Sequence, residues 1–263
     1  MRVAYILTLL LLTLGSLANA NAYDQQKLRE RLIWRYGARV PVQWGMHLDG
    51  VVDRLTTSEN VIALTFDACG VGGDGYDKQL IDFLIAEKIP ATLFLTARWI
   101  EQHPSEAALL AKHPQFEIEN HGAQHKPLSV NGNQAYHIKG TASVTEAVTE
   151  IQDGSNAIVE LTGRVPTYFR SGTAHYDEIA VLIVQDLVCD PAGFSINGDA
   201  GATFSKAQVV GALSEAKSGD IVIMHMNRPK GLTFEGLKQV LPLWRERGFR
   251  FVCLNHPIEA LSP

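Results

Sequence analysis

The sequence predicts an α/β fold built on a mostly parallel sheet. Short apolar runs such as Val61–Leu64 and Ile221–Met224 alternate with longer segments whose apolar residues recur at helical spacing. Strands that alternate with helices are typical of parallel sheets, because a helix carries the chain back to the start of the next strand. The 263 residues and 46% hydrophobic content are enough for one large domain with a full core. The alternation alone fits an open doubly wound sheet and a closed barrel equally well.

The first twenty residues have the three parts of an export signal. Arg2 precedes an apolar stretch from Val3 to Leu14, and small residues follow as far as Ala20. The apolar stretch is shorter than the roughly 20 residues that cross a bilayer, so we expect cleavage after Ala20 rather than a retained anchor. The mature protein is therefore expected to be periplasmic or secreted, with no stable membrane insertion.

Residues 21–58 are predicted to form an N-terminal helical extension that packs on the catalytic domain, residues 59–263. Leu28 and Leu32 lie one helical turn apart, which predicts a helix from Gln25 to Tyr36. Low-complexity tracts and internal repeats are missing from the sequence that follows. The remaining elements are therefore assigned to a single unit.

The elements of the main domain follow from hydrophobic periodicity and capping signals. The longest helix begins with Ser143-Val144-Thr145-Glu146, a capping box. Strands are predicted from Val61 onward and at Ala91–Leu95, Phe116–Glu119, Thr167–Arg170, Ile221–His225 and Phe249–Leu254. Helices are predicted at Tyr76–Lys88, Pro104–Lys112, Ser143–Leu161, Tyr176–Leu187, Lys206–Lys217 and Phe234–Arg247. Ser129–Thr141 contains Asn131-Gly132-Asn133 and is predicted to be a surface loop.

Composition excludes two classes of protein. The net charge of -5 provides no clustered basic surface for nucleic acid, so nucleic-acid binding is not expected. Three cysteines are too few for a disulfide framework, and their odd number leaves at least one without a partner in the chain. Their pairing is left open.

Several polar residues end predicted strands. Asp67, Arg170 and His225 all lie at carboxyl ends, the edge where parallel α/β folds build their sites. His121 and His125 follow another strand with a spacing that places both rings on one face of a helical turn. A carboxylate and two imidazoles are what a metal-assisted hydrolase needs, since a divalent ion lowers the pKa of water toward neutrality.

Four motifs in order resemble those of the polysaccharide deacetylase family, carbohydrate esterase family four, over about residues 60–255. Thr65-Phe66-Asp67-Ala68-Cys69-Gly70 resembles the first motif, and His121 to His125 the second. Phe169-Arg170-Ser171-Gly172 and Ile223-Met224-His225 resemble the third and fifth. The resemblance implies a distorted (β/α) barrel of seven or eight mostly parallel strands and metal-dependent removal of acetyl groups from a sugar polymer.

The resemblance also implies a role for each matching residue. Asp67 would be the general base that deprotonates the attacking water, and Arg170 would orient it and keep it ionised. His121 and His125 would be metal ligands through neutral imidazole nitrogens. His225 would be the general acid that protonates the leaving amine.

Two parts of the resemblance are weaker. Asp199 falls where the family has an aspartate that steadies the acid, but Ala200 follows it in place of the expected tryptophan, and Asn197 is a nearly equal candidate. In the turn after Arg170, Thr173 is the best candidate for a backbone N–H that stabilises the oxyanion. His175 and Tyr176 are close enough in sequence to line the pocket, although Tyr176 could equally pack at a helix start.

The main departure from the family is Ala68, which replaces the aspartate that binds the metal. Two histidines do not complete a catalytic zinc site, which usually has three protein ligands. Asp67, Asp74, Asp77 and Cys69 are candidates for the third, and weak or absent metal binding is the remaining alternative. Zinc, or another divalent metal, is the expected cofactor with its third protein ligand unassigned.

Three functions follow from this interpretation. The first is an exported deacetylase that hydrolyses N-acetyl groups of a polysaccharide, with peptidoglycan or a chitin-like glycan as substrate. The second is a glycan-binding protein that keeps the fold without turnover, for which Ala68 is the supporting feature. The third is an O-acetyl esterase, which would use the same residues on a different leaving group.

Overall fold

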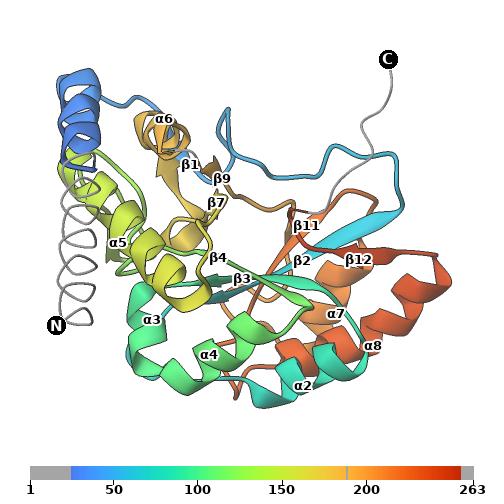
Figure 1. Ribbon diagram of the computed structural model, residues 1–263. Helices are drawn as coiled ribbons and strands as arrows, with labels where there is room; N and C mark the ends of the chain where they lie inside the picture. Colours follow the sequence, from blue (N-terminus) through green and yellow to red (C-terminus); the bar gives the residue numbers. More distant parts are fainter. Residues whose placement is uncertain (1–24, 188, 256–263) are drawn as a thin grey trace, which may run out of the picture.

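The main sheet is parallel throughout and curls into half of a barrel (Figure 1). The computed structural model describes residues 25–187 and 189–255. Its sheet contains β2 (Val61–Ala68), β3 (Ala91–Leu95), β4 (Phe116–Asn120), β7 (Tyr168–Phe169), β9 (Asp190–Pro191), β10 (Ile196–Asn197), β11 (Ile221–His225) and β12 (Arg250–Val252). The order is β10-β11-β2-β3-β4-β7-β9, and β12 pairs with the start of β2. The predicted distorted (β/α) barrel is confirmed. Its sheet is curled and only partly closed.

Helices cover the outside of this sheet. In Figure 1, α2, α4, α7 and α8 lie along one side of it, and α5 and α6 lie toward the β7–β9 end. Their bounds are α2 (Lys78–Ala86), α3 (Ala97–Gln102), α4 (Pro104–Lys112), α5 (Val144–Thr162), α6 (Glu178–Asp186), α7 (Lys206–Ser214) and α8 (Thr233–Glu246). Residues 25–36 form a further helix, as predicted. Ser143 caps α5 by accepting a hydrogen bond from the N–H of Glu146.

The buried apolar residues form three clusters. The largest fills the space between the sheet and the helices α2, α4, α7 and α8, and it includes Ala68. The second joins the helix of residues 25–36 to α5 and α6. The third lies inside the curl of the sheet and includes Leu55, Phe194 and Ile223. Alternate residues of a strand face opposite sides, so the two sides of β2 contribute to different clusters.

The N-terminal extension crosses the open side of the sheet. Val52 forms a bridge with Ala192, just after β9, and Arg54 forms one with Asp220, just before β11. The N–H of Val52 donates to the carbonyl of Pro191 (2.8 Å), and the N–H of Leu55 donates to the carbonyl of Gly219 (2.8 Å). This segment therefore connects the chain after β9, at one end of the sheet, to the chain just before β11.

Most predicted elements are present, and the differences are local. The predicted helix start at Tyr176 is wrong by two residues, because Tyr176–Asp177 forms β8, which pairs with β1 (Trp44–Gly45) before α6 begins. The predicted surface loop Ser129–Thr141 contains an antiparallel hairpin of β5 (Gln134–Ala135) and β6 (Ile138–Lys139). The short strands β9 and β10 and the helix α3 were not predicted, because two to six residues carry no readable period.

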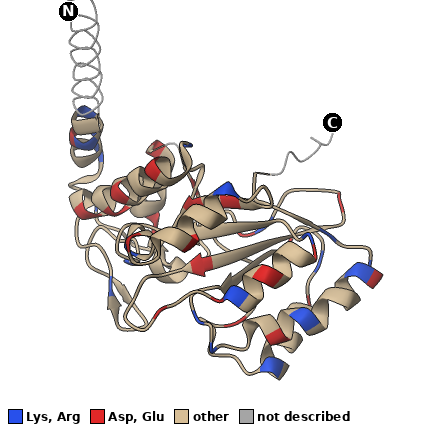
Figure 2. Cartoon of the chain, turned by 60° about the horizontal axis from the view of Figure 1, so that its bottom comes forward, with Lys and Arg blue, Asp and Glu red and all other residues tan. Residues whose placement is uncertain are grey.

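The described part of the chain has mixed charge, no membrane-spanning helix and three free thiols. Basic and acidic residues are interleaved along the helices in the view of Figure 2. Within residues 25–187 and 189–255, no helix has both the length and the apolar character needed to cross a bilayer. Cys69, Cys189 and Cys253 are all free thiols. The predicted signal, residues 1–20, lies outside the described residues.

Glu119 is a buried carboxylate that joins β4 to β7. Only Asn120 and Phe169 pair directly between these strands. The carboxylate of Glu119 adds to that pairing by accepting hydrogen bonds from the N–H groups of Thr167 (2.9 Å) and Tyr168 (2.7 Å). Burial raises the pKa of Glu119 to about 7, although the N–H groups of Tyr168 and Thr167 act in the opposite direction.

The raised pKa makes the free energy of unfolding depend on pH. Below about pH 4.5 Glu119 is protonated in both states, whereas between about 4.5 and 7 only the native state keeps the proton. The free energy of unfolding is therefore expected to fall by up to about 3 kcal/mol as the pH rises through this window. Glu119→Gln should make the free energy of unfolding depend less on pH. Urea unfolding at a series of pH values from 5 to 8 measures this. Asp82→Asn, which alters an exposed carboxylate on α2, is the control, and equal slopes for wild type and Glu119→Gln would contradict the prediction.

Candidate active site

The carboxyl end of β2 supplies two chemical groups to the inside of the curled sheet. Asp67 and Cys69 are two residues apart, so the pleat of the strand directs both side chains to the same face. Ala68, between them, belongs to the core under the helices and is fully buried there. The next residue, Gly70, has φ +70, and a Cβ at this position would lie 2.7 Å from the backbone nitrogen of Trp99.

Asp67 forms a buried ion pair with Arg170. One guanidinium nitrogen of Arg170 lies 2.7 Å from Oδ1 of Asp67 and 2.9 Å from the hydroxyl of Thr65, and the other donates to the carbonyl of Gly193 (2.9 Å). Arg170 also lies over the ring of Phe94, with 4.1 Å from Cζ to the ring centroid. Burial raises the pKa of Asp67, but Arg170, His121 and His225 together hold that pKa below its usual value. The carboxylate is therefore ionised at neutral pH with a fixed orientation.

His121, His125 and Cys69 form a compact buried group. Each can offer one ligand atom, and these atoms lie within 4.8 Å of one another. Nδ1 of His121 is 2.8 Å from the carbonyl of Arg170, an arrangement that places the proton on Nδ1. Nε2 of His121 then faces Sγ of Cys69 at 4.0 Å and Oδ2 of Asp67 at 3.5 Å. His121 and His125 are edge to face, with ring centroids 4.9 Å apart.

The chemistry of this group fits a divalent metal ion. Burial opposes ionisation of the Cys69 thiol, but the neighbouring His125, His121 and His225 rings bring its pKa well below the usual value. Nδ1 of His125 is buried and has no hydrogen-bond partner. A thiolate and two imidazoles in a tight group are donors that zinc accepts. Among the four candidates for the third ligand, Cys69 is therefore the one that the structure groups with both histidines.

Two of the other candidates for the third ligand, Asp74 and Asp77, are engaged elsewhere. Asp77 caps α2 by accepting from the N–H of Leu80 (3.0 Å). Asp74 accepts from the N–H of Val71 (2.8 Å) and from the side-chain amide of Asn227 (2.7 Å). A guanidinium nitrogen of Arg228 lies 2.9 Å from Oδ1 of Asp74. Asp77 therefore stabilises the start of α2, and Asp74 stabilises the loop after β2.

His225 is held by Asp199 at the end of β11. Nδ1 of His225 lies 2.8 Å from Oδ1 of Asp199, and the backbone N–H of His225 donates to Oδ2 of the same carboxylate (2.7 Å). The hydroxyl of Thr233, at the start of α8, also donates to Oδ2 (2.8 Å). Burial lowers the pKa of His225, but Asp199 outweighs it and holds that pKa well above its usual value. Asn197 is not the partner, since its side-chain oxygen accepts from the N–H of Ala200 (2.8 Å).

The turn after Arg170 is packed tightly against the second histidine. A Cβ at Gly172 would lie 2.1 Å from the carbonyl oxygen of His125, so only glycine permits this approach. Thr173 follows with φ +66, a rare conformation for a β-branched residue. Such strain persists only where surrounding contacts impose it and is concentrated at functional sites. The turn thereby places Thr173 on the wall of the cavity.

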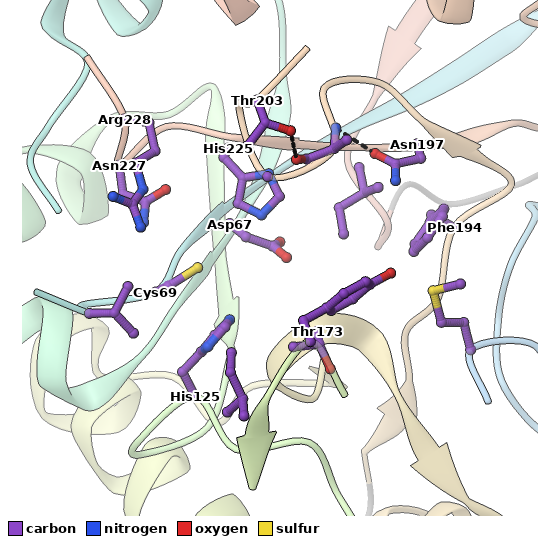
Figure 3. A pocket seen from close by; sticks show the side chains of 17 residues that line it. Asp67, Cys69, His125, Thr173, Phe194, Asn197, Thr203, His225, Asn227 and Arg228 are labelled. Atoms are coloured by element: carbon purple, nitrogen blue, oxygen red, sulfur yellow. Dashed lines mark hydrogen bonds between the residues drawn. The ribbon is translucent and has the colours of Figure 1, made fainter. Parts of the chain in front are cut away.

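A cavity of about 490 Å³ opens over these groups (Figure 3). Asp67, Cys69, His125 and His225 point into it, and in the view of Figure 3 Thr173 lies beside His125 below Asp67, with Phe194 to the right. Met46 from the extension and Tyr136 from the β5–β6 hairpin complete the wall. These last two residues lie in segments that contain no recognisable sequence signal of a site.

Tyr176 does not line the cavity. Its side chain is fully buried, and its hydroxyl donates toward the carbonyls of Phe169 and Ala192 (3.0 Å each) while accepting from the N–H of Ser171 (2.9 Å). This corrects the prediction of a substrate-contacting role and supports the alternative of a packing residue. Thr233 and Thr65 were missed as partners of Asp199 and Arg170, because a threonine hydroxyl has no sequence signal until the fold brings it to a carboxylate or guanidinium.

Comparison with known proteins gives consistent matches. The sequence profile of the polysaccharide deacetylase family matches residues 54–191. A bifunctional xylanase/deacetylase from Pseudobutyrivibrio xylanivorans is 24% identical over 206 residues, which are 78% of this chain but 31% of that protein. The chain thus spans about a third of that relative.

Solved structures show the same fold at low sequence identity. A peptidoglycan N-acetylglucosamine deacetylase matches with a TM-score of 0.66 at 19% identity, covering 79% of this chain and 92% of that one. A pseudoenzyme of carbohydrate esterase family four from Bacillus anthracis matches with a TM-score of 0.65 at 18% identity, covering 79% and 68%. The same architecture therefore occurs in an enzyme and in a protein described as a pseudoenzyme.

Proposed function

The chain belongs to the polysaccharide deacetylase family, and from this premise we propose that it is an exported, metal-dependent hydrolase that removes N-acetyl groups from peptidoglycan or a chitin-like glycan. The observation that supports this most strongly is the grouping of Cys69, His121 and His125 beside a buried Asp67–Arg170 pair. Export to the periplasm or beyond is supported by the signal-like residues 1–20.

The proposed metal ligands are Cys69, His121 and His125, and zinc is the proposed ion. When bound, a divalent ion supplies Lewis-acid polarisation and lowers the pKa of water. The carbonyl of Arg170 keeps the proton of His121 on Nδ1, which leaves Nε2 with a lone pair on the cavity side. The aspartate that the family uses as a ligand is thus replaced in function by a thiolate one residue further along the strand.

Asp67 is the proposed general base. Oδ1 is occupied by Arg170, so Oδ2 is the oxygen available to accept a proton from the attacking water. The low pKa of Asp67 keeps it ionised when substrate arrives, and the ion pair prevents the carboxylate from rotating. The strained Thr173 turn is placed to offer a backbone N–H to the oxyanion that develops on the acetyl carbonyl.

His225 is the proposed general acid. Asp199 fixes Nδ1, so Nε2 is the nitrogen that can donate a proton to the leaving amine. Since Asp199 raises the pKa of His225, the ring carries this proton at neutral pH. Thr233 and the backbone N–H of His225 in turn fix Asp199.

The test is acetate release by the purified mature chain from chitin oligomers, peptidoglycan and O-acetylated xylan, with elemental analysis of the same sample. We expect about one zinc per chain, acetate from the N-acetylated polymers, and loss of activity on chelation. Acetate from xylan alone would instead indicate an O-acetyl esterase. A chain that retains the glycans without releasing acetate from any of them would indicate a glycan-binding protein and overturn the proposal.

A further inference from the structure

The hairpin of β5 and β6 presents an exposed aromatic ring at the edge of the cavity. Tyr136 is at its tip and lines the cavity, yet 70% of its surface is exposed. Large aromatic side chains are usually covered in a folded domain, and a cavity edge is where an amphipathic ring can meet a ligand. Ile138, on the following strand, also lines the cavity.

The tip holds Tyr136 in a strained conformation. A two-residue connection links β5 to β6, and both of its residues have positive φ, 50° at Tyr136 and 63° at His137. Such turns are normally made with Asn and Gly, because a tyrosine or histidine in the left-handed region is strained. The hairpin therefore has a tyrosine where local structure favours a much smaller residue.

Hydrogen bonds fix the base of the hairpin, so the backbone that carries Tyr136 has a defined position. The N–H of Gly140 donates to the carbonyl of Asn133 (3.0 Å), and the N–H of Thr141 donates to the carbonyl of Pro127 (3.1 Å). The hydroxyl of Ser129 lies 2.8 Å from the side chain of Asn131 and accepts from the N–H of Asn133 (3.2 Å). These bonds tie the hairpin to the loop that follows His125.

Tyr136 also contacts the turn that carries Thr173. Its ring is edge to face with His175, with centroids 5.6 Å apart, and Nδ1 of His175 lies 2.8 Å from the carbonyl of Thr173. His175 also contacts the extension, with 5.6 Å between its ring centroid and that of Trp44. The ring of Tyr136 is thus anchored beside the cavity wall while most of its surface remains open.

We propose that Tyr136 forms a subsite for the sugar ring next to the acetylated one, a proposal that rests on the proposed function. A pyranose whose substituents are mostly equatorial, such as glucosamine, has a face of C–H groups that packs on an aromatic ring, and the phenol hydroxyl stays in water. The substrate class is therefore a polymer or oligomer of such sugars with at least two rings. Tyr136 is a binding residue here and takes no part in proton transfer.

The test compares Tyr136→Asn with His137→Asn on a chitin hexamer and on p-nitrophenyl acetate, which has no neighbouring sugar. Asparagine adopts the left-handed conformation easily, so Tyr136→Asn removes the ring without lowering the melting temperature. We expect KM for the hexamer to rise about fivefold to tenfold with kcat within about twofold, and kcat/KM for the small ester to fall by less than about twofold. His137→Asn should match the wild type on both substrates, and Tyr136→Phe, which keeps the ring, should keep the wild-type KM for the hexamer.

Two results would overturn the subsite: an unchanged KM for the hexamer in Tyr136→Asn, or an equal loss in His137→Asn or on the small ester. If the wild type releases no acetate from the hexamer, calorimetric binding of the hexamer decides the subsite, and the proposed function fails only if peptidoglycan also yields no acetate. Weaker binding by Tyr136→Asn than by the wild type then supports the subsite. Equal binding, or no binding by the wild type, refutes it.

Discussion

Replacing Cys69 with serine is expected to remove most of the bound metal and to abolish deacetylation. Cys69 is the third member of the group with His121 and His125, and the two histidines alone do not complete a catalytic site. Loss of a direct ligand should weaken metal affinity by more than about a hundredfold, since even outer partners of ligands contribute about tenfold to a hundredfold. Elemental analysis after dialysis and acetate release from a chitin hexamer measure the two losses.

The chain provides matched controls for this change. Cys189→Ser and Cys253→Ser alter the other two free thiols, which lie outside the group, and both should keep metal and activity. Cys69→Asp restores an anionic ligand at the same position and should recover part of the metal content. A Cys69→Ser protein that still carries a full equivalent of metal would exclude the thiolate as ligand.

Asp67→Asn is expected to lower kcat by about a thousandfold while metal content stays near the wild-type value. The amide oxygen can still accept the hydrogen bond from Arg170, so the guanidinium keeps a partner and the fold survives. The amide cannot accept a proton from water at neutral pH, and the reaction loses its base. Initial rates of acetate release, circular dichroism and elemental analysis on one sample measure turnover, fold and metal together.

Asp74→Asn is the comparison for Asp67→Asn. Asp74 is a carboxylate on the loop after β2 that contacts Arg228 and Asn227 and lies outside the metal-ligating group. The Asp74→Asn variant should keep most of the wild-type kcat. If Asp67→Asn retained more than about a tenth of wild-type kcat, another group would have to be the base.

The sequence predicted those parts of the site that lie at strand ends. β2 and β11 are continuous apolar runs, and their parallel pairing places Asp67 opposite His225 in register. Arg170, after β7, reaches the same edge because β4 connects it to β3 and β2 in the parallel order. These positions follow from strand alternation and from the shared direction of the carboxyl ends.

The proposed third ligand, Cys69, could not be assigned from sequence, because the direction of its side chain depends on where β2 ends. Alternation along β2 places Cys69 on the face of Asp67 and Ala68 in the outer core, but a strand end can turn before alternation applies. Tyr136 was missed for a different reason. Its hairpin strands have two residues each, and contact with the cavity arises from the docking of the hairpin base on the loop after His125.

Segment 46–55 has a consequence for how this protein can be divided. It supplies Met46 to the cavity wall and hydrogen-bonds to the chain beside β9 at one end and beside β11 at the other. A boundary at residue 59 would therefore remove these hydrogen bonds and one residue of the pocket wall. Any fusion or shortened expression product intended to retain turnover should therefore begin before Trp44. Such a product keeps the pairing of β1 with β8 and the whole of segment 46–55.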